Sequence, residues 1–267
     1  MKKLKGSAWC KDFQEMIKNR KPNSPDMRAI RDDWETLQFK QIIKNFFQGL
    51  EQFIVISCSD SNPGPVEFCI TDIKEKAYQR AFYKNGTTAL VKPCGSSLVI
   101  KWLDLEVPVA LTGLSRNPSL DLIGKIEGEY AIVELKKEMP SHTPFFALQE
   151  VVMYALSVKK NNRNGRHLKY HEKITTTNGR AAVEPGNYWA NYQDCKYLII
   201  AAPETYWLEW KGYVEILKEI VGWINEEYKY DIFFAKFNEV NFRAQKEPGS
   251  SYWPCLEEGD NKWYVVE

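Results

Sequence analysis

The apolar residues of the N-terminal part recur at helical spacing. Ser24 and Pro25 are suited to the N-cap and to the first position of a helix. From Ile30 to Leu50 the apolar positions then stay on one helix face. This pattern predicts one long amphipathic helix over residues 23–53.

Two further stretches predict helices in the second half of the chain. Residues 143–160 open with Thr143 and Pro144, again an N-cap residue and a residue for the first helical position. Because this stretch is apolar nearly all round, we expect its helix to be buried. Residues 212–228 carry a single apolar stripe, which predicts a second amphipathic helix.

Shorter apolar runs between these helices predict a sheet. Residues 53–112 contain several runs separated by proline, glycine and asparagine turns, and residues 196–202 read as a strongly buried strand. The expected fold class is therefore α/β, with a mixed central sheet flanked by helices. We expect one compact domain made of three segments: an N-terminal addition (1–95), a core (96–205) and a C-terminal addition (206–267).

Composition and charge narrow the class of protein. Hydrophobic residues make up 44% of the 267 residues and charged residues 27%, which is typical of a soluble globular protein. The 36 basic and 35 acidic residues nearly cancel, so the chain as a whole is not suited to coating nucleic acid, although a local basic groove stays open. The sequence has no apolar run that would span a membrane and no secretion signal, so we expect a cytoplasmic protein.

One hairpin brings two carboxylates together. The runs 120–126 and 130–136 are joined by Glu127 and Gly128, which suit a two-residue turn. That turn sets Asp121 opposite Glu134, with their Cβ atoms about 4.5–5.5 Å apart on one face. Side chains alternate along a strand, so Lys136 shares this face.

The facing carboxylates predict a cation site. Like charges placed opposite each other across two strands repel, and they destabilise the sheet. A divalent cation between Asp121 and Glu134 would turn this repulsion into attraction. Carboxylate and carbonyl oxygens are the ligands that Mg²⁺ and Mn²⁺ prefer. A simpler alternative is an edge hairpin on which Glu134 and Lys136 are merely solvated.

These residues carry a resemblance to a known family. Asp121, followed thirteen residues later by Glu134-Leu135-Lys136, resembles the signature of the PD-(D/E)XK nuclease superfamily. The order of helix, hairpin, helix and strand over residues 100–205 is similar to the restriction-endonuclease-like core of that family. Gln149 and Tyr154 on the following helix resemble the RecB-like branch, with one residue more between them than the branch pattern has.

The resemblance implies a metal-dependent nuclease. Asp121, Glu134 and the carbonyl of Leu135 would hold Mg²⁺ or Mn²⁺, and Lys136 would orient the attacking water or stabilise the transition state. Gln149 would lie in the catalytic cleft. The residues that the resemblance adds as further candidates are Glu106, Glu51, Glu35 and Tyr154.

DNA is the expected substrate and partner. Lys160, Arg163 and Arg166 belong to the densest basic cluster of the chain, and aromatic residues follow it, as in a loop that contacts phosphates and stacks on bases. A solvated loop is an equally good interpretation of this cluster. A homodimer or a partner from a defence or repair complex stays open. The alternative function is a catalytically inactive nucleic-acid-binding or scaffold module.

Overall fold

The chain is described here by a computed structural model. It describes nine ranges, and everything below refers to them: 17–18, 20–53, 75–108, 119–137, 142–163, 195–238, 242–246, 252–257 and 261–267.

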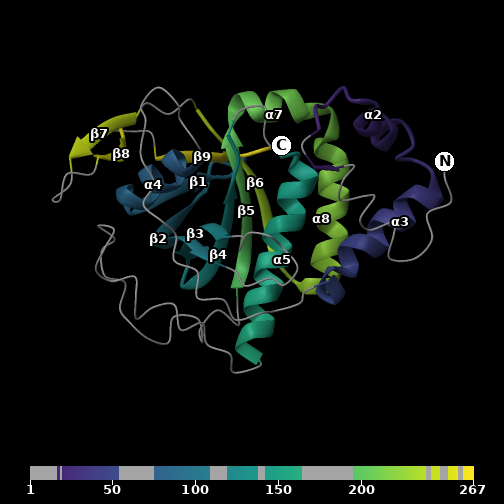
Figure 1. Ribbon diagram of the computed structural model, residues 1–267, viewed down its shortest axis with the longest axis horizontal. Helices are drawn as coiled ribbons and strands as arrows, with labels where there is room; N and C mark the ends of the chain where they lie inside the picture. Colours follow the sequence, from purple (N-terminus) through teal and green to yellow (C-terminus); the bar gives the residue numbers. More distant parts are fainter. Residues whose placement is uncertain are drawn as a thin grey trace.

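Seven strands close into a mixed barrel in the order β1-β2-β3-β4-β5-β6-β9 (Figure 1). The first four are antiparallel neighbours, whereas β4, β5 and β6 are parallel. Strands β7 and β8 form a separate antiparallel pair. The strands are β1 (Thr87–Val91), β2 (Ser97–Pro108), β3 (Ser119–Ile126), β4 (Glu129–Leu135), β5 (Cys195–Pro203), β6 (Asp231–Phe237), β7 (Phe242–Lys246), β8 (Tyr252–Leu256) and β9 (Lys262–Val265).

Strand β9 closes the barrel and corrects the expected fold class. It pairs in parallel with β1 and antiparallel with β6, so the sheet has no free edge at either of those strands. The expectation of an open, restriction-endonuclease-like sheet flanked by helices is therefore wrong. The physical reason is that closure joins β1 to a strand about 170 residues further along the chain, and periodicity carries no information on such long-range pairing.

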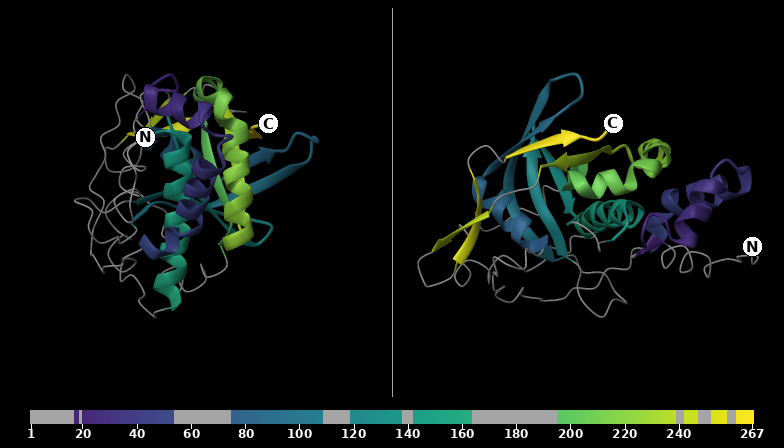
Figure 2. Two further views of the ribbon diagram at one scale, coloured as in Figure 1. Left: turned by 90° about the vertical axis from the view of Figure 1, so that its right-hand side faces the viewer. Right: turned by 90° about the horizontal axis from the view of Figure 1, so that it is seen from above.

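Helices cover one face of the barrel strands (Figure 2). Helix α5 contacts β4 and β5, α8 contacts β6, and α3 packs on α8. Helix α4 contacts β2 on the other side of the molecule, together with β8. The helices are α2 (Pro25–Asp32), α3 (Leu37–Gln48), η1 (Leu50–Phe53), α4 (Glu75–Asn85), α5 (Pro144–Arg163), α7 (Glu204–Trp210), η3 (Lys211–Tyr213) and α8 (Val214–Tyr228).

The two faces of strands β3–β6 belong to two separate apolar cores. Ile123 and Ile132 lie in the core between the sheet and helices α5 and α8. Leu122 and Val133 lie in the second core, inside the barrel and against α4. Strands that are buried on both faces read as continuous apolar runs rather than alternating ones. A charged residue on one of these strands therefore departs from the apolar pattern that burial on both faces favours.

The expected long N-terminal helix is two helices and a short 3₁₀ turn. Its start is confirmed, because the backbone N–H of Met27 donates to the Ser24 hydroxyl at 3.4 Å. The helix ends at Asp32, and α3 starts at Leu37. Between them the Thr36 hydroxyl donates to the carbonyl of Asp33 at 2.8 Å. Such local side-chain hydrogen bonds compete with the helical ones, so the break has a physical cause that the apolar spacing hides.

Other expectations are confirmed in part. Helix α5 starts at Pro144, with the N–H of Phe146 donating to the Thr143 hydroxyl at 3.2 Å, and it runs on to Arg163. Strand β5 and helix α8 occupy the expected ranges. The expected strand-rich region is corrected, because residues 75–85 form helix α4, while residues 54–74 lie outside the described ranges.

Candidate functional site

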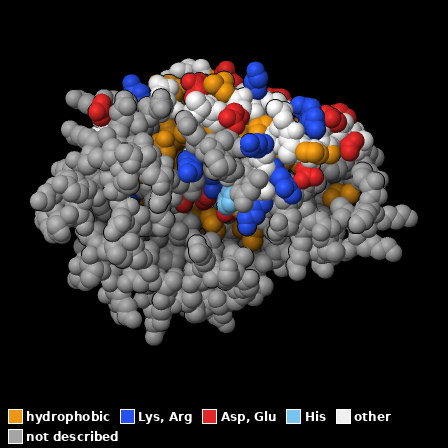
Figure 3. Space-filling model, turned by 45° about the horizontal axis from the view of Figure 1, so that its top comes forward, with side chains coloured by type: hydrophobic (Ala, Val, Ile, Leu, Met, Phe, Trp, Pro, Cys, Tyr) orange, Lys and Arg blue, Asp and Glu red, His pale blue; other side chains and the backbone are white. Residues whose placement is uncertain are grey.

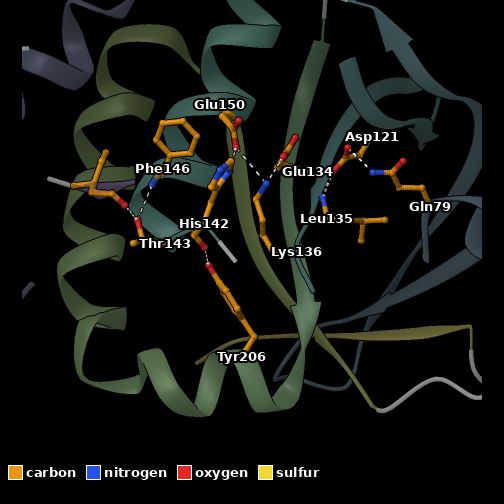
Figure 4. A network of polar contacts seen from close by, with 11 residues as sticks. Gln79, Asp121, Glu134, Leu135, Lys136, His142, Thr143, Phe146, Glu150 and Tyr206 are labelled. Carbon is orange, nitrogen blue, oxygen red and sulfur yellow. Dashed lines mark hydrogen bonds and ion pairs between the residues drawn. The ribbon is translucent and has the colours of Figure 1, made fainter. Parts of the chain in front are cut away.

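The predicted hairpin and its register are confirmed. Glu127 and Gly128 form the turn with φ values of 52° and 89°, and two positive values are what a type I′ hairpin turn requires. Pairs of opposed residues run from Ile126 and Glu129 to Leu122 and Val133. The pairs end there, so the predicted pair of Asp121 and Glu134 lies one step beyond them, and Figure 4 draws both side chains at this end of the hairpin.

Asp121 is buried, and both of its carboxylate oxygens accept hydrogen bonds. Gln79 of α4 donates its side-chain amide to Oδ1 at 2.6 Å. The backbone N–H of Leu135 donates to Oδ2 at 2.7 Å. The Asp121 side chain therefore satisfies a backbone donor at the point where the ladder of paired residues between β3 and β4 ends. Together these bonds fix the position of the carboxylate.

Lys136 lies between two carboxylates at the end of β4. Its ammonium group donates to Oε1 of Glu134 and, at 3.2 Å, to Oε2 of Glu150 on α5. Its backbone N–H donates to the carbonyl of Ala201 at 2.9 Å, which ties it to β5. Asp121, Glu134 and Lys136 are only 6%, 4% and 2% exposed. The site is thus a buried set of charges, which excludes the solvated edge hairpin.

Glu150 joins this set to His142 (Figure 4). Nδ1 of His142 lies 3.4 Å from Oε2 of Glu150, and the imidazole meets the ring of Phe146 edge to face at 4.5 Å between centroids. The Tyr206 hydroxyl donates to the carbonyl of His142 at 2.7 Å. Burial raises the pKa of Glu150, but the charge of Lys136 and the contact with His142 outweigh it, so the pKa is lowered overall. Glu150 is therefore an anion at neutral pH.

Tyr154 and Gln149 lie on the same helix in different roles. Burial, together with the charges of Glu150 and Glu134, raises the pKa of Tyr154 well above its ordinary value, so its hydroxyl is neutral. Gln149 is buried, and its amide donates weakly to the sulfur of Met153 at 3.4 Å. The residue of α5 that contacts Lys136 is Glu150 rather than Gln149.

The additional acidic candidates lie elsewhere or are not described. Glu35 is exposed and pairs with Lys40 at 3.3 Å. Glu51 is exposed on η1, and Glu106 belongs to β2. Within the described residues, no contact links Glu35 or Glu51 to Asp121, Glu134 or Lys136, so the expectation that the first helix supplies a metal carboxylate gains no support.

The basic cluster falls partly on a helix. Lys160 and Arg163 belong to the last turns of α5, whereas Arg166 lies outside the described residues. On the face drawn in Figure 3, Lys and Arg side chains gather around a histidine and several acidic side chains. Of the three histidines in the sequence, the described ranges include His142 alone.

Three residues of the site were missed from the sequence: Gln79, His142 and Glu150. Glu150 precedes Tyr154 by four residues, so their shared helix face was a usable signal. Gln79 lies beside Tyr78 and Phe82, whose spacing of four suits a helix in this part of the chain. For His142 the sequence offers no signal, because this residue precedes α5 and helical spacing does not set its direction.

The donor atoms of the site fit a hydrated cation. Each carboxylate oxygen has two lone pairs, so Asp121 and Glu134 can accept their hydrogen bonds and still ligate a metal. Among the described residues, the buried amide oxygens of Gln79 and Gln149 accept no hydrogen bond. The same residues include no group of three or more His, Cys, Asp or Glu placed to hold a metal. Mg²⁺, which keeps several waters and binds through one or two carboxylates and substrate phosphates, therefore stays a prediction for this site.

The remaining observations are negative. In comparisons with known proteins, no family model, curated protein or solved structure matches this chain. Among the helices of the described ranges, none combines the length and the apolar character needed to cross a bilayer.

Proposed function

We propose that this chain is a metal-dependent nuclease that hydrolyses phosphodiester bonds of DNA. The observation that carries the proposal is the burial of Asp121, Glu134 and Lys136 together at the end of one hairpin. Buried charges cost several kcal/mol each in desolvation, and an apolar replacement of such a network is often neutral or stabilising. A folding requirement alone therefore does not account for them. Buried charged groups that cost stability in this way are typical of catalytic sites.

The role of Lys136 follows from its two contacts. An amine held between the carboxylates of Glu134 and Glu150 is an ammonium ion, so it donates protons in hydrogen bonds and does not accept one. We therefore assign it to the phosphoryl oxygens, where it stabilises the negative charge of the transition state.

Asp121 and Glu134 would hold the cation. Gln79 and the N–H of Leu135 keep the Asp121 carboxylate in place, and the carbonyl of Leu135 is the third ligand that the motif resemblance implies. Bound Mg²⁺ or Mn²⁺ supplies an activated water and neutralises charge on the phosphate. These residues and the motif support nuclease function, whereas the fold class does not.

Two features support DNA as the substrate: the motif resemblance and the basic cluster of Lys160, Arg163 and Arg166. Phosphate contacts by such side chains supply salt-dependent affinity without sequence preference. A second candidate, an inactive nucleic-acid-binding module on the same scaffold, is favoured by one observation. Lys136 already neutralises Glu134, and the described residues include no group of three or more His, Cys, Asp or Glu placed to hold a metal.

A cleavage assay tests the proposal. Purified protein is incubated with supercoiled plasmid and with single-stranded DNA, in EDTA, in Mg²⁺ and in Mn²⁺. Glu134→Gln serves as the site variant, and Glu35→Gln serves as a matched surface control. We expect cleavage with either metal, none in EDTA, none by Glu134→Gln, and wild-type rates for Glu35→Gln. Binding without cleavage under all conditions would favour the inactive module instead.

A further inference from the structure

We propose that His142 is the general base of the hydrolysis, a catalytic residue that accepts the proton of the attacking water at Nε2. This inference rests on the proposed function and adds a residue to it. Hydrolysis needs a proton acceptor, and Lys136 is unsuited because two carboxylates keep it charged. The carboxylates of Glu134 and Glu150 accept from Lys136, whereas the imidazole of His142 next to them offers a ring nitrogen suited to accepting a proton near neutral pH.

The contact with Glu150 decides which ring nitrogen carries the hydrogen. Nδ1 lies 3.4 Å from a carboxylate oxygen that can only accept, since Glu150 is ionised. Neutral His142 is therefore protonated at Nδ1, and the lone pair stays on Nε2. A carboxylate that fixes the tautomer of a histidine base in this way is a general catalytic device.

The ring is also held in place. The edge-to-face contact with Phe146 fixes one side of the imidazole, and Tyr206 anchors the backbone through the carbonyl of His142. The side chain is still 31% exposed, so a substrate can reach it. A general base must come within hydrogen-bond distance of the proton that it accepts. Its ring must therefore be fixed in position and still accessible.

A chain of contacts connects His142 to the end of the hairpin that is proposed to bind the metal. Its imidazole and the ammonium of Lys136 contact the same oxygen of Glu150, and Lys136 in turn contacts Glu134. The proposed base therefore stands two short contacts from the transition-state donor. Figure 4 shows this row running from Glu134 to His142.

Charges of both signs face the imidazole. The carboxylate of Glu150 on α5 contacts Nδ1, and the ammonium of Lys136 contacts the same carboxylate oxygen. Lys18 lies over the Phe146 ring at 5.4 Å from the centroid and adds a second positive charge on that side. The Tyr206 hydroxyl meets the backbone carbonyl, not the ring.

The reaction is balanced with these groups. A water oxygen uses a lone pair to form a bond to phosphorus while its proton passes to Nε2 of His142. The bond from phosphorus to the leaving oxygen breaks, its electron pair stays on that oxygen, and a proton from solvent neutralises it. The imidazolium then returns its proton to solvent. The products are a phosphomonoester and an alcohol.

The tautomer can be measured without metal or substrate. Nitrogen-15 NMR of the metal-free protein distinguishes the two neutral tautomers, and the His142 signals are assigned by their loss in His142→Gln. We expect the neutral ring to carry its hydrogen on Nδ1, and Glu150→Gln to weaken this preference. A ring protonated at Nε2 would overturn the proposal, because that nitrogen could not accept a proton.

Kinetics test the proton transfer itself. With plasmid DNA and Mg²⁺, we expect His142→Ala to lower the cleavage rate by about 10²-fold or more and to flatten its rise with pH. Added imidazoles should restore the rate to His142→Ala in proportion to their basicity, and should restore nothing to Lys136→Ala. If wild type cleaves and His142→Ala cleaves equally well, the base is wrong and the nuclease stands. If wild type itself does not cleave, both proposals fall.

Discussion

Two lysines in this molecule each lie between two glutamates, in opposite surroundings. Lys40 on α3 contacts Glu35 at 3.3 Å and Glu219 of α8 at 3.2 Å. Its side chain is 24% exposed, and that of Glu35 is 87% exposed. Lys136 contacts Glu134 and Glu150 in the same manner, but its side chain is 2% exposed. The chemical groups are the same, and burial is what distinguishes them.

The difference in burial indicates different roles for the charges around Lys40 and the charges around Lys136. Around Lys40, water screens the charges, and such a surface pair adds about 1 kcal/mol or less to stability. Around Lys136, the desolvation of the ions offsets most of their attraction. The buried set therefore stabilises the fold no better than apolar side chains would, yet its loss would be costly. We attribute its presence to the chemistry of the site.

The largest expected effect separates the two lysines by stability. Lys136→Met leaves the buried Glu134 and the partly buried Glu150 without their shared cation, and we expect a loss of about 3–5 kcal/mol in the free energy of unfolding. Lys40→Met, the matched surface variant, should lose about 1 kcal/mol or less. Urea unfolding of both variants measures the difference. Equal losses would contradict the distinction between the buried and the exposed set.

A smaller effect concerns Asp121 and its two donors. Asp121→Ala strands the N–H of Leu135 and the amide of Gln79, which we expect to cost about 2 kcal/mol or more. Asp121→Asn should cost about 1 kcal/mol or less, because Gln79 can rotate its amide and accept from the new side chain while Leu135 keeps an acceptor. Unfolding curves in EDTA compare the two. An Asn variant as unstable as the Ala variant would argue against these hydrogen bonds.

The local part of this structure could be predicted from the sequence. Glu127 and Gly128 set the hairpin turn, and with it the register that pairs Ile126 with Glu129 and Leu122 with Val133. The caps at Ser24 and Thr143 were equally clear, because each depends on a few neighbouring residues. Barrel closure depends on the pairing of β1 with β9, which no local pattern encodes.

The candidate site also combines contacts that the sequence pattern predicts with contacts that it does not. Glu134 and Lys136 share a face by strand alternation, so the sequence was enough to place them together. Gln79 reaches Asp121 from 42 positions away, and the sequence pattern predicts strands rather than a helix in its part of the chain. His142 meets Glu150 from a position before the start of α5, where helical spacing does not apply. Contacts between separate elements are what the sequence pattern could not supply.

The smallest expected effect is an acid response of the buried set. The pKa of Glu150 is lowered in the folded protein, so the stabilisation it contributes is present above the unfolded value of about 4.3 and is lost as the pH falls through the lower folded value. Glu150→Gln should remove this part of the acid response, while Glu35→Gln should keep it. Urea unfolding at pH 7, 5, 4 and 3 checks this, and an unchanged response in Glu150→Gln would contradict it.

The most direct test of the central claim is the cleavage rate of Lys136→Ala beside its metal binding. We expect wild type to nick plasmid DNA in Mg²⁺ or Mn²⁺, and Lys136→Ala to do so at least about 10²-fold more slowly, as for the loss of one transition-state donor. Calorimetric titration should find Mn²⁺ binding retained, because Asp121 and Glu134 remain. Cleavage at the wild-type rate by Lys136→Ala, in a sample confirmed to be folded, would contradict the assignment of this buried set to catalysis.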